Sequence, residues 1–123
     1  MTINEAISKL RDIKPTQYAN DVLVGWLSEL EQKVWMENIC WHEDVVDTPP
    51  WPYHPEQDMD TRLLIPEPYS VVYIHYMEAQ IDRYNGDSVR YANSMVMFNT
   101  ALSEYVDWFN RRHMPKQSAY VRF

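Results

Sequence analysis

The stretch that decides the fold is residues 68–112, PYSVVYIHYMEAQIDRYNGDSVRYANSMVMFNTALSEYVDWFNRR. Its second half places apolar side chains alternately four and three residues apart, a spacing typical of one helix packed along another. The Asn85-Gly86 pair ends the first half, because glycine readily adopts the left-handed conformation that terminates helices. We therefore predict an antiparallel hairpin of helices at about 67–85 and 88–112, the second capped by Asp87 or Ser88. Its predicted apolar face consists of Tyr91, Met95, Phe98, Leu102, Tyr105 and Phe109.

Two shorter helices are predicted before this hairpin, at about 3–12 and 20–39. Thr2 and Glu5 have the spacing of a capping box, and Asn20 suits the N-cap of the second helix. Gly25 lies inside that helix, where glycine costs about 1 kcal/mol relative to alanine. We expect it to mark a close contact with another helix. The predicted fold class is all-α, a small helical bundle built on the C-terminal hairpin.

A long connection, residues 41–65, separates the second and third helices and is rich in proline, aromatic and acidic residues. Connections of this length are uncommon in compact domains. Its proline-rich part should be extended, and Leu63, Leu64 and Ile65 suit a short strand or an apolar strap. The chain is thus expected to form a single helical domain, residues 1–115, followed by a basic C-terminal tail, residues 116–123.

The charge of the chain is separated along the sequence. The net charge is −7, and the segment 37–67 holds eight acidic residues and one base, whereas residues 111–123 hold four bases and no acidic residue. An acidic molecule is a poor non-specific ligand for nucleic acid or anionic membranes. No apolar run is long enough to span a membrane, and the N-terminus lacks a secretory signal pattern. The single cysteine, Cys40, excludes an internal disulfide, so we expect synthesis in a reducing cytoplasm.

Candidate chemical groups do not combine into a known catalytic or metal-binding pattern. His75 and Glu78 reverse the Glu-x-x-His order of bundle di-iron sites. The acidic connection contains His42 and His54 but lacks the rigid ligand spacing of a zinc site, and a solvated loop is the better interpretation. Cys40 and His42 match no catalytic-cysteine signature. We therefore expect no catalytic residue, no cofactor and no metal.

Aromatic and charged residues give a stronger indication of protein binding, since Trp, Tyr and Arg are enriched at interfaces. In one interpretation, the aromatic residues of the connection belong to the core and the charges keep the protein soluble. In the other, the aromatic residues anchor a protein interface, and the basic tail of one subunit contacts the acidic connection of its neighbour. The candidate interface residues are Trp41, Trp51, Tyr53, Glu43, Asp44, Asp47, Arg111, Arg112, Lys116 and Arg122.

Residues 63–115, LLIPEPYSVVYIHYMEAQIDRYNGDSVRYANSMVMFNTALSEYVDWFNRRHMP, resemble the small head–tail connector (adaptor, or head-completion) proteins of tailed bacteriophages and prophages of Gram-positive bacteria. The PYSVVYIHYMEAQID helix, the NGD turn and the RYANSMVMFN helix before HMP carry the resemblance, and the opening MTINEAISKLRDIKPTQYANDVLVGWLSELEQKV is also similar. The resemblance implies a non-enzymatic virion protein, without cofactor, that joins the portal vertex to tail-side connector proteins. It also implies a ring of subunits around the DNA channel. DNA is expected to pass nearby without specific binding, because the chain is acidic.

Two alternatives belong to other functional classes. A cellular helical adaptor would bind a single protein partner through the aromatic connection, forming a discrete complex instead of a ring. A metal-dependent bundle enzyme is the third, and least favoured, interpretation. The connector interpretation places the protein in the virion after synthesis in the bacterial host cytoplasm.

Overall fold

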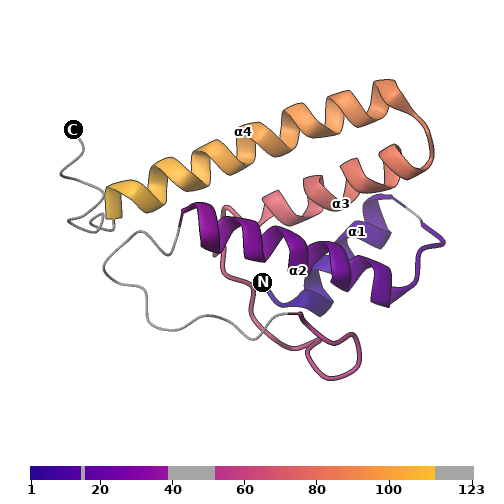
Figure 1. Cartoon of the computed structure of the whole chain (residues 1–123), viewed down its shortest axis with the longest axis horizontal. Coiled ribbons are helices and arrows are strands. Elements are labelled where there is room, and N and C mark those ends of the chain that lie inside the picture. Colours follow the sequence, from indigo (N-terminus) through magenta and orange to yellow (C-terminus); the bar gives the residue numbers. More distant parts are fainter. Residues whose placement is uncertain (15, 39–51, 113–123) are drawn as a thin grey trace.

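The computed structural model describes residues 1–14, 16–38 and 52–112, and Figure 1 shows their arrangement. The regular structure of these residues consists of α1 (Ile3–Ile13), α2 (Asn20–Glu37), α3 (Val71–Tyr84) and α4 (Ser88–Arg112). Apart from one isolated bridge between Thr2 and Arg62, no residue in these ranges pairs in a β-structure. The all-α class is therefore confirmed. The predicted connection is described from residue 52 onward, and the predicted tail lies outside the described residues.

α1 begins at the predicted capping box. The Thr2 hydroxyl accepts a hydrogen bond from the Glu5 amide at 3.2 Å, and the Glu5 carboxylate accepts one from the Thr2 amide at 3.4 Å. These two bonds satisfy amides that have no partner within the helix. The apolar face then buries Ile3, Ile7 and Leu10. The capping prediction is confirmed.

α2 begins differently from the prediction, because Ala19 occupies the N-cap and makes no side-chain capping bond. Asn20 is the first helical residue, and its side-chain oxygen accepts a hydrogen bond from Arg11 at 2.8 Å. The same guanidinium donates to the carbonyls of Thr16 and Tyr18. The prediction that Asn20 caps the helix was therefore wrong. Its side chain is one of three acceptors through which Arg11 binds the α1–α2 connection.

α3 and α4 are joined by a turn that the sequence located well. Gly86 has φ +75°, the left-handed conformation in which a side chain is disfavoured. The Asp87 carboxylate accepts a hydrogen bond from the Arg90 amide at 3.1 Å and so caps α4. α3 starts at Val71, later than the predicted residue 67. Pro68 disfavours the helical conformation of Glu67, the predicted first residue, and residues 67–70 form turns instead.

Aromatic side chains fill the space between α3 and α4. Tyr76 packs on Phe98 with ring centroids 5.3 Å apart, and Tyr105 lies 5.8 Å from Phe109. Near the start of α3, Tyr69 packs on Trp108 at 5.3 Å. The predicted apolar face of α4 is turned inward, with its members buried or half-buried. Such pairs add about 0.5–1.5 kcal/mol each beyond the burial of their area.

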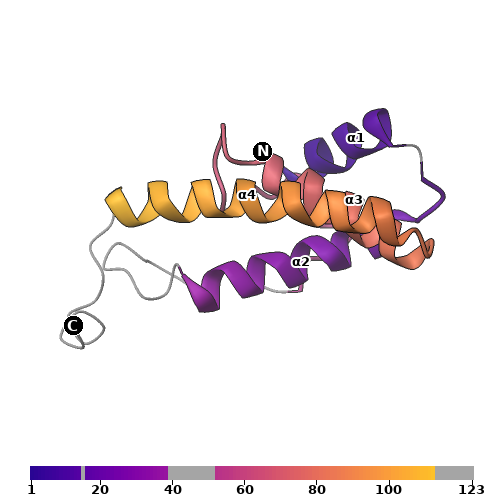
Figure 2. The same cartoon turned by 90° about the horizontal axis from the view of Figure 1, so that it is seen from above.

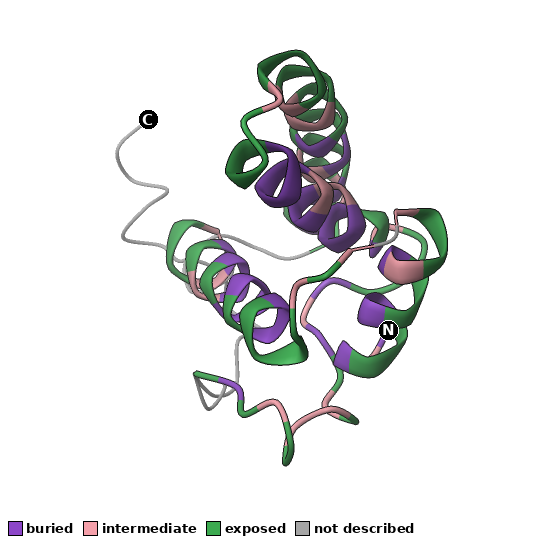
Figure 3. Cartoon of the chain, turned by 90° about the vertical axis from the view of Figure 1, so that its right-hand side faces the viewer, coloured by how far each residue is buried: buried purple, intermediate pink, exposed green. Residues whose placement is uncertain are grey.

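α3 is the central helix, since it contacts each of the other three. Seen from above, α1 and α2 lie on opposite sides of the pair formed by α3 and α4 (Figure 2). Figure 3 shows buried residues where the helices face one another and exposed residues on the outer side of α4. α4 has 25 residues and is about 37 Å long at 1.5 Å per residue. It thus extends well past the 14-residue α3.

Residues 52–65, which we call the strap, cross beneath the helices and return the chain to α3. The amide of Ile3 donates to the Thr61 carbonyl at 3.1 Å, and the amide of Leu63 donates to the Met1 carbonyl at 2.9 Å. Leu63 and Ile65 are buried in the core. Of the two predicted forms of this segment, the structure has the apolar strap.

The two glycines supply a matched test of the backbone. Gly25 is exposed, and a Cβ atom there would have no neighbour within 4 Å, so the expected close helix contact was wrong. Gly25→Ala should stabilise the protein by about 1 kcal/mol, because alanine favours the helix. Gly86→Ala should destabilise it by about 1 kcal/mol, because of the positive φ. Urea unfolding of the two variants measures both effects, and equal shifts of the same sign would contradict this account.

Candidate functional site

Most of the candidate interface residues predicted from the sequence lie outside the described part of the chain. These residues are Trp41, Trp51, Glu43, Asp44, Asp47, Lys116 and Arg122. Arg111 and Arg112 are described, and both are exposed at the C-terminal end of α4. The Arg112 guanidinium lies over the Trp108 ring, 5.4 Å from its centroid. The basic end of α4 is thus open to solvent, where a partner can reach it.

Tyr53 requires a correction, because the structure places it in the core with 5% of its surface exposed. Its amide donates to the Ser28 hydroxyl at 2.9 Å, and its phenol donates to the Glu31 carboxylate at 3.3 Å. A buried tyrosine needs a partner for its hydroxyl group, and α2 provides one here. Tyr53 therefore attaches the strap to α2 and is not part of the exposed surface.

Glu31 of α2 is the centre of this buried polar network and is fully inaccessible to solvent. One of its oxygens accepts the Leu64 amide at 2.9 Å, and the other accepts the Tyr73 hydroxyl at 2.8 Å. The Tyr73 oxygen in turn accepts the Ile65 amide at 2.8 Å. One carboxylate therefore joins α2, α3 and the strap. The sequence contained a signal for the burial of this residue: Glu31 follows Leu27 by four residues and precedes Val34 by three, which places it on the apolar face of α2.

Burial dominates the electrostatics of this carboxyl group and raises the pKa of Glu31 from 4.5 to about 7. The hydrogen bonds from Leu64, Tyr73 and Tyr53 act in the opposite direction, because they favour the charged form. Burial also raises the pKa of the Tyr73 hydroxyl, which keeps that group neutral and able to donate. The unfolded chain would release the Glu31 proton near pH 4.5, whereas the folded chain retains it up to about pH 7.

This difference predicts a pH-dependent stability. The contribution of Glu31 is fully present below about pH 4.5 and is lost as the pH rises to about 7, because the folded state binds the extra proton only in that window. The loss is on the order of 3 kcal/mol. Urea unfolding of the parent and of Glu31→Gln at several pH values from 4 to 8 should show the parent losing stability relative to the variant. Parallel curves would contradict the prediction.

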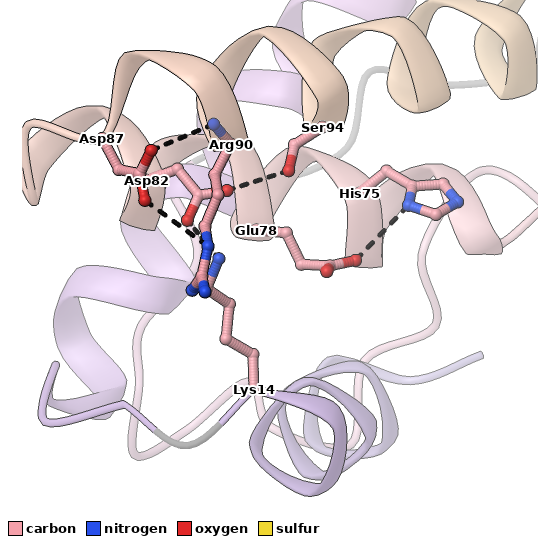
Figure 4. Close-up of polar contacts among 7 residues, drawn as sticks. All are labelled: Lys14, His75, Glu78, Asp82, Asp87, Arg90 and Ser94. Carbon is pink, nitrogen blue, oxygen red and sulfur yellow. Dashed lines mark hydrogen bonds and ion pairs between the residues drawn. The ribbon is translucent and has the colours of Figure 1, made fainter.

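A second polar cluster joins α1, α3 and α4 (Figure 4). The Asp82 carboxylate is buried, forms an ion pair with Lys14 at the end of α1, and accepts the Ser94 hydroxyl at 2.9 Å. Lys14 is partly exposed, so its ammonium group also remains near water. The carboxylate is the group that depends on its partners, because a buried charge without a partner is costly.

Lys14→Met should therefore destabilise the protein by about 1–3 kcal/mol, because it leaves the Asp82 carboxylate with fewer partners. Lys9→Met on the exposed side of α1 is the matched control and should change stability by less than about 0.5 kcal/mol. Urea unfolding at neutral pH compares the two variants. An equal effect of the two substitutions would show that the Asp82 ion pair adds nothing to stability.

His75 and Glu78 lie one turn apart on α3, and their side chains approach to 3.4 Å (Figure 4). They form a local pair on the helix surface. Among the described residues, no three His, Cys, Asp or Glu side chains gather in a way that would hold a metal ion. The histidines and acidic residues between 39 and 51 lie outside that range.

A groove of about 410 Å³ lies between α1 and the start of α3. Its apolar lining includes Met1, Ile13, Pro68, Val71 and Ile74, and charged or titratable groups, Lys9, Glu67, His75 and Glu78, also line it. Ile13 and Val71 are exposed although both are large aliphatic residues. An exposed aliphatic surface beside charged groups has the composition of a protein-binding site.

The outer face of α4 is the second unusual surface. Residues 91–103, YANSMVMFNTALS, contain no charged side chain. The side turned away from α3 carries exposed, uncharged residues: Val89, Ala92 and Val96 are aliphatic, and Asn93, Thr100 and Ser103 are polar. A solvent-facing helix side normally carries charged residues. We call this side the outer face of α4.

Comparisons with protein families, with characterised proteins and with solved structures found no match to this chain. No helix in the described ranges has both the length and the apolar character needed to cross a lipid bilayer.

Proposed function

We propose that the chain is a structural subunit of a bacteriophage or prophage virion, and that it connects the portal vertex of the capsid to the tail. The outer face of α4 is the observation that carries this proposal: an exposed helix side without charge, about 20 Å long, in a chain of net charge −7. Such a side is expected in a subunit that is covered by neighbouring proteins in its working state.

Three further features support the same role. The groove between α1 and α3 offers a second exposed surface, where aliphatic side chains lie beside charged ones. Arg111 and Arg112 place positive charge at the end of a helix about 37 Å long. The resemblance of residues 63–115 to phage head–tail connector proteins, drawn from the sequence, favours the same role. An acidic subunit would also line a DNA channel without retaining the DNA.

A ring of subunits around that channel is the assembly we propose. The ring can be tested by native mass spectrometry over a concentration series, with electron microscopy of the large species. Closed rings of uniform copy number are the expected result. A discrete complex with one cellular protein would favour the alternative, an adaptor that binds a single partner.

The virion location needs its own experiment. The bacterium that encodes the chain would be treated to induce its prophages, and released particles would be separated into tailed, DNA-filled particles and soluble protein. The chain should co-purify with the tailed particles in a constant ratio to their portal protein. Its presence only in the soluble fraction, while tailed particles form normally, would contradict a connector function.

A further inference from the structure

The described part of the chain presents two exposed surfaces that carry aliphatic side chains and differ in shape. One is the outer face of α4, a convex helix side; the other is the groove between α1 and the start of α3. Figure 3 views the molecule from one end, with exposed residues along the outer side of α4 at the top and with α1 at the right. α4 and α1, which contribute to the two surfaces, therefore lie on different sides of the molecule in this view.

We infer that these two surfaces bind each other in successive copies of the chain, the outer face of α4 of one copy lying in the α1–α3 groove of the next. This inference rests on the proposed function, because it assigns the contact between neighbouring subunits of the ring. Joining two different surfaces gives a head-to-tail contact, which can repeat and close into a ring.

Shape and composition favour a second copy as the occupant of the groove. The outer face of α4 offers small residues around Val96, whose side chain is 63% exposed. The groove offers Ile13 and Val71, which are 63% and 42% exposed. A helix side of this kind packs well between two others, because its ridges fit the groove that they form. The outer face of α4 brings no charge of its own into the contact, whereas Lys9, Glu67 and Glu78 line the groove.

The charges beside the two surfaces are also compatible. Arg90 and Glu104 are exposed on α4, one near each end of the uncharged stretch. The groove is lined by charges of both signs, Lys9 on α1 and Glu67 and Glu78 at α3. Opposite charges can therefore meet on both sides of the apolar contact, which would select its register. A two-fold contact between two α4 faces would leave the groove and its charges without a role.

A single helix side buries less area than the roughly 800 Å² per partner of a typical stable complex. An isolated pair should therefore be weak, and a ring gains because every subunit makes both contacts. Weak association is best detected by cross-linking. Exposed positions suit this purpose, because cysteine at Val96, Val71 or Glu29 replaces no buried side chain.

The experiment uses full-length chains with Cys40→Ser, which removes the only cysteine of the sequence. Val96→Cys is added in one preparation and Val71→Cys in another, and the mixture is treated with a short bis-maleimide. The 96–71 product should form at least about tenfold faster than the 96–29 product made with the control Glu29→Cys, because binding raises the local concentration. Fastest formation of the 96–96 product would indicate a two-fold α4 contact and overturn the inference. Equal rates for all pairs would also overturn it.

Complementation gives a second readout by sedimentation velocity. Val96→Glu damages the outer face of α4 and Val71→Glu damages the groove, so each variant alone should sediment as a monomer. Their mixture retains one intact face and one intact groove. Because this single contact is weak, the mixture should form dimers only at high protein concentration, and nothing larger. Self-association of Val71→Glu alone would overturn the inference. The connector function is tested separately, by the presence of the chain in tailed particles. That result does not depend on which surfaces form the contact.

Discussion

The fold depends on a carboxylate that the core removes completely from water. Glu31 accepts hydrogen bonds from the strap and from α3, and it lies on α2, so three segments distant in sequence meet at its two oxygens. Each neighbour named in these bonds is a donor. An aliphatic side chain of similar size would remove the acceptor of the Leu64 amide and of the Tyr73 hydroxyl, at about 1–3 kcal/mol for each group. The core therefore requires a hydrogen-bond acceptor at this position, and the hydrogen bonds offset the cost of removing a carboxyl group from water.

The raised pKa of Glu31 follows from the same constraint. Three hydrogen bonds to a carboxylate would ordinarily favour the charged form, but burial outweighs them, so the group is protonated over part of the neutral range. Asp82 shows the contrasting arrangement. It too is buried, but it has a cation, Lys14, as its ion-pair partner. The two clusters join the same central helix, α3, to its neighbours by different means: one through neutral donors and one through an opposite charge.

The helices could be predicted because their signals are local. Apolar spacing, the capping box at Thr2 and the left-handed glycine at residue 86 each depend on residues within one or two turns. Two of the errors arose where a residue outside the local helix decided the outcome. The side chain of Asn20 accepts a hydrogen bond from Arg11 and does not cap its own helix. Tyr53 is buried because Glu31 and Ser28 of α2 are its hydrogen-bond partners. Pairing over such distances leaves no mark in local sequence.

The two surfaces also differ in how far the sequence could predict them. The absence of charge between residues 91 and 103 is visible in the sequence, and the apolar spacing there predicts which of these residues face α3. The groove joins Ile13 to Val71 across 58 positions and could not be found by periodicity. If successive copies join through these two surfaces, the angle between them decides the assembly: a rotation that closes gives a ring, and one that does not gives an open filament. The strap and the Asp82 cluster hold α1, α3 and α4 together, so the groups that stabilise the single chain would also set that angle.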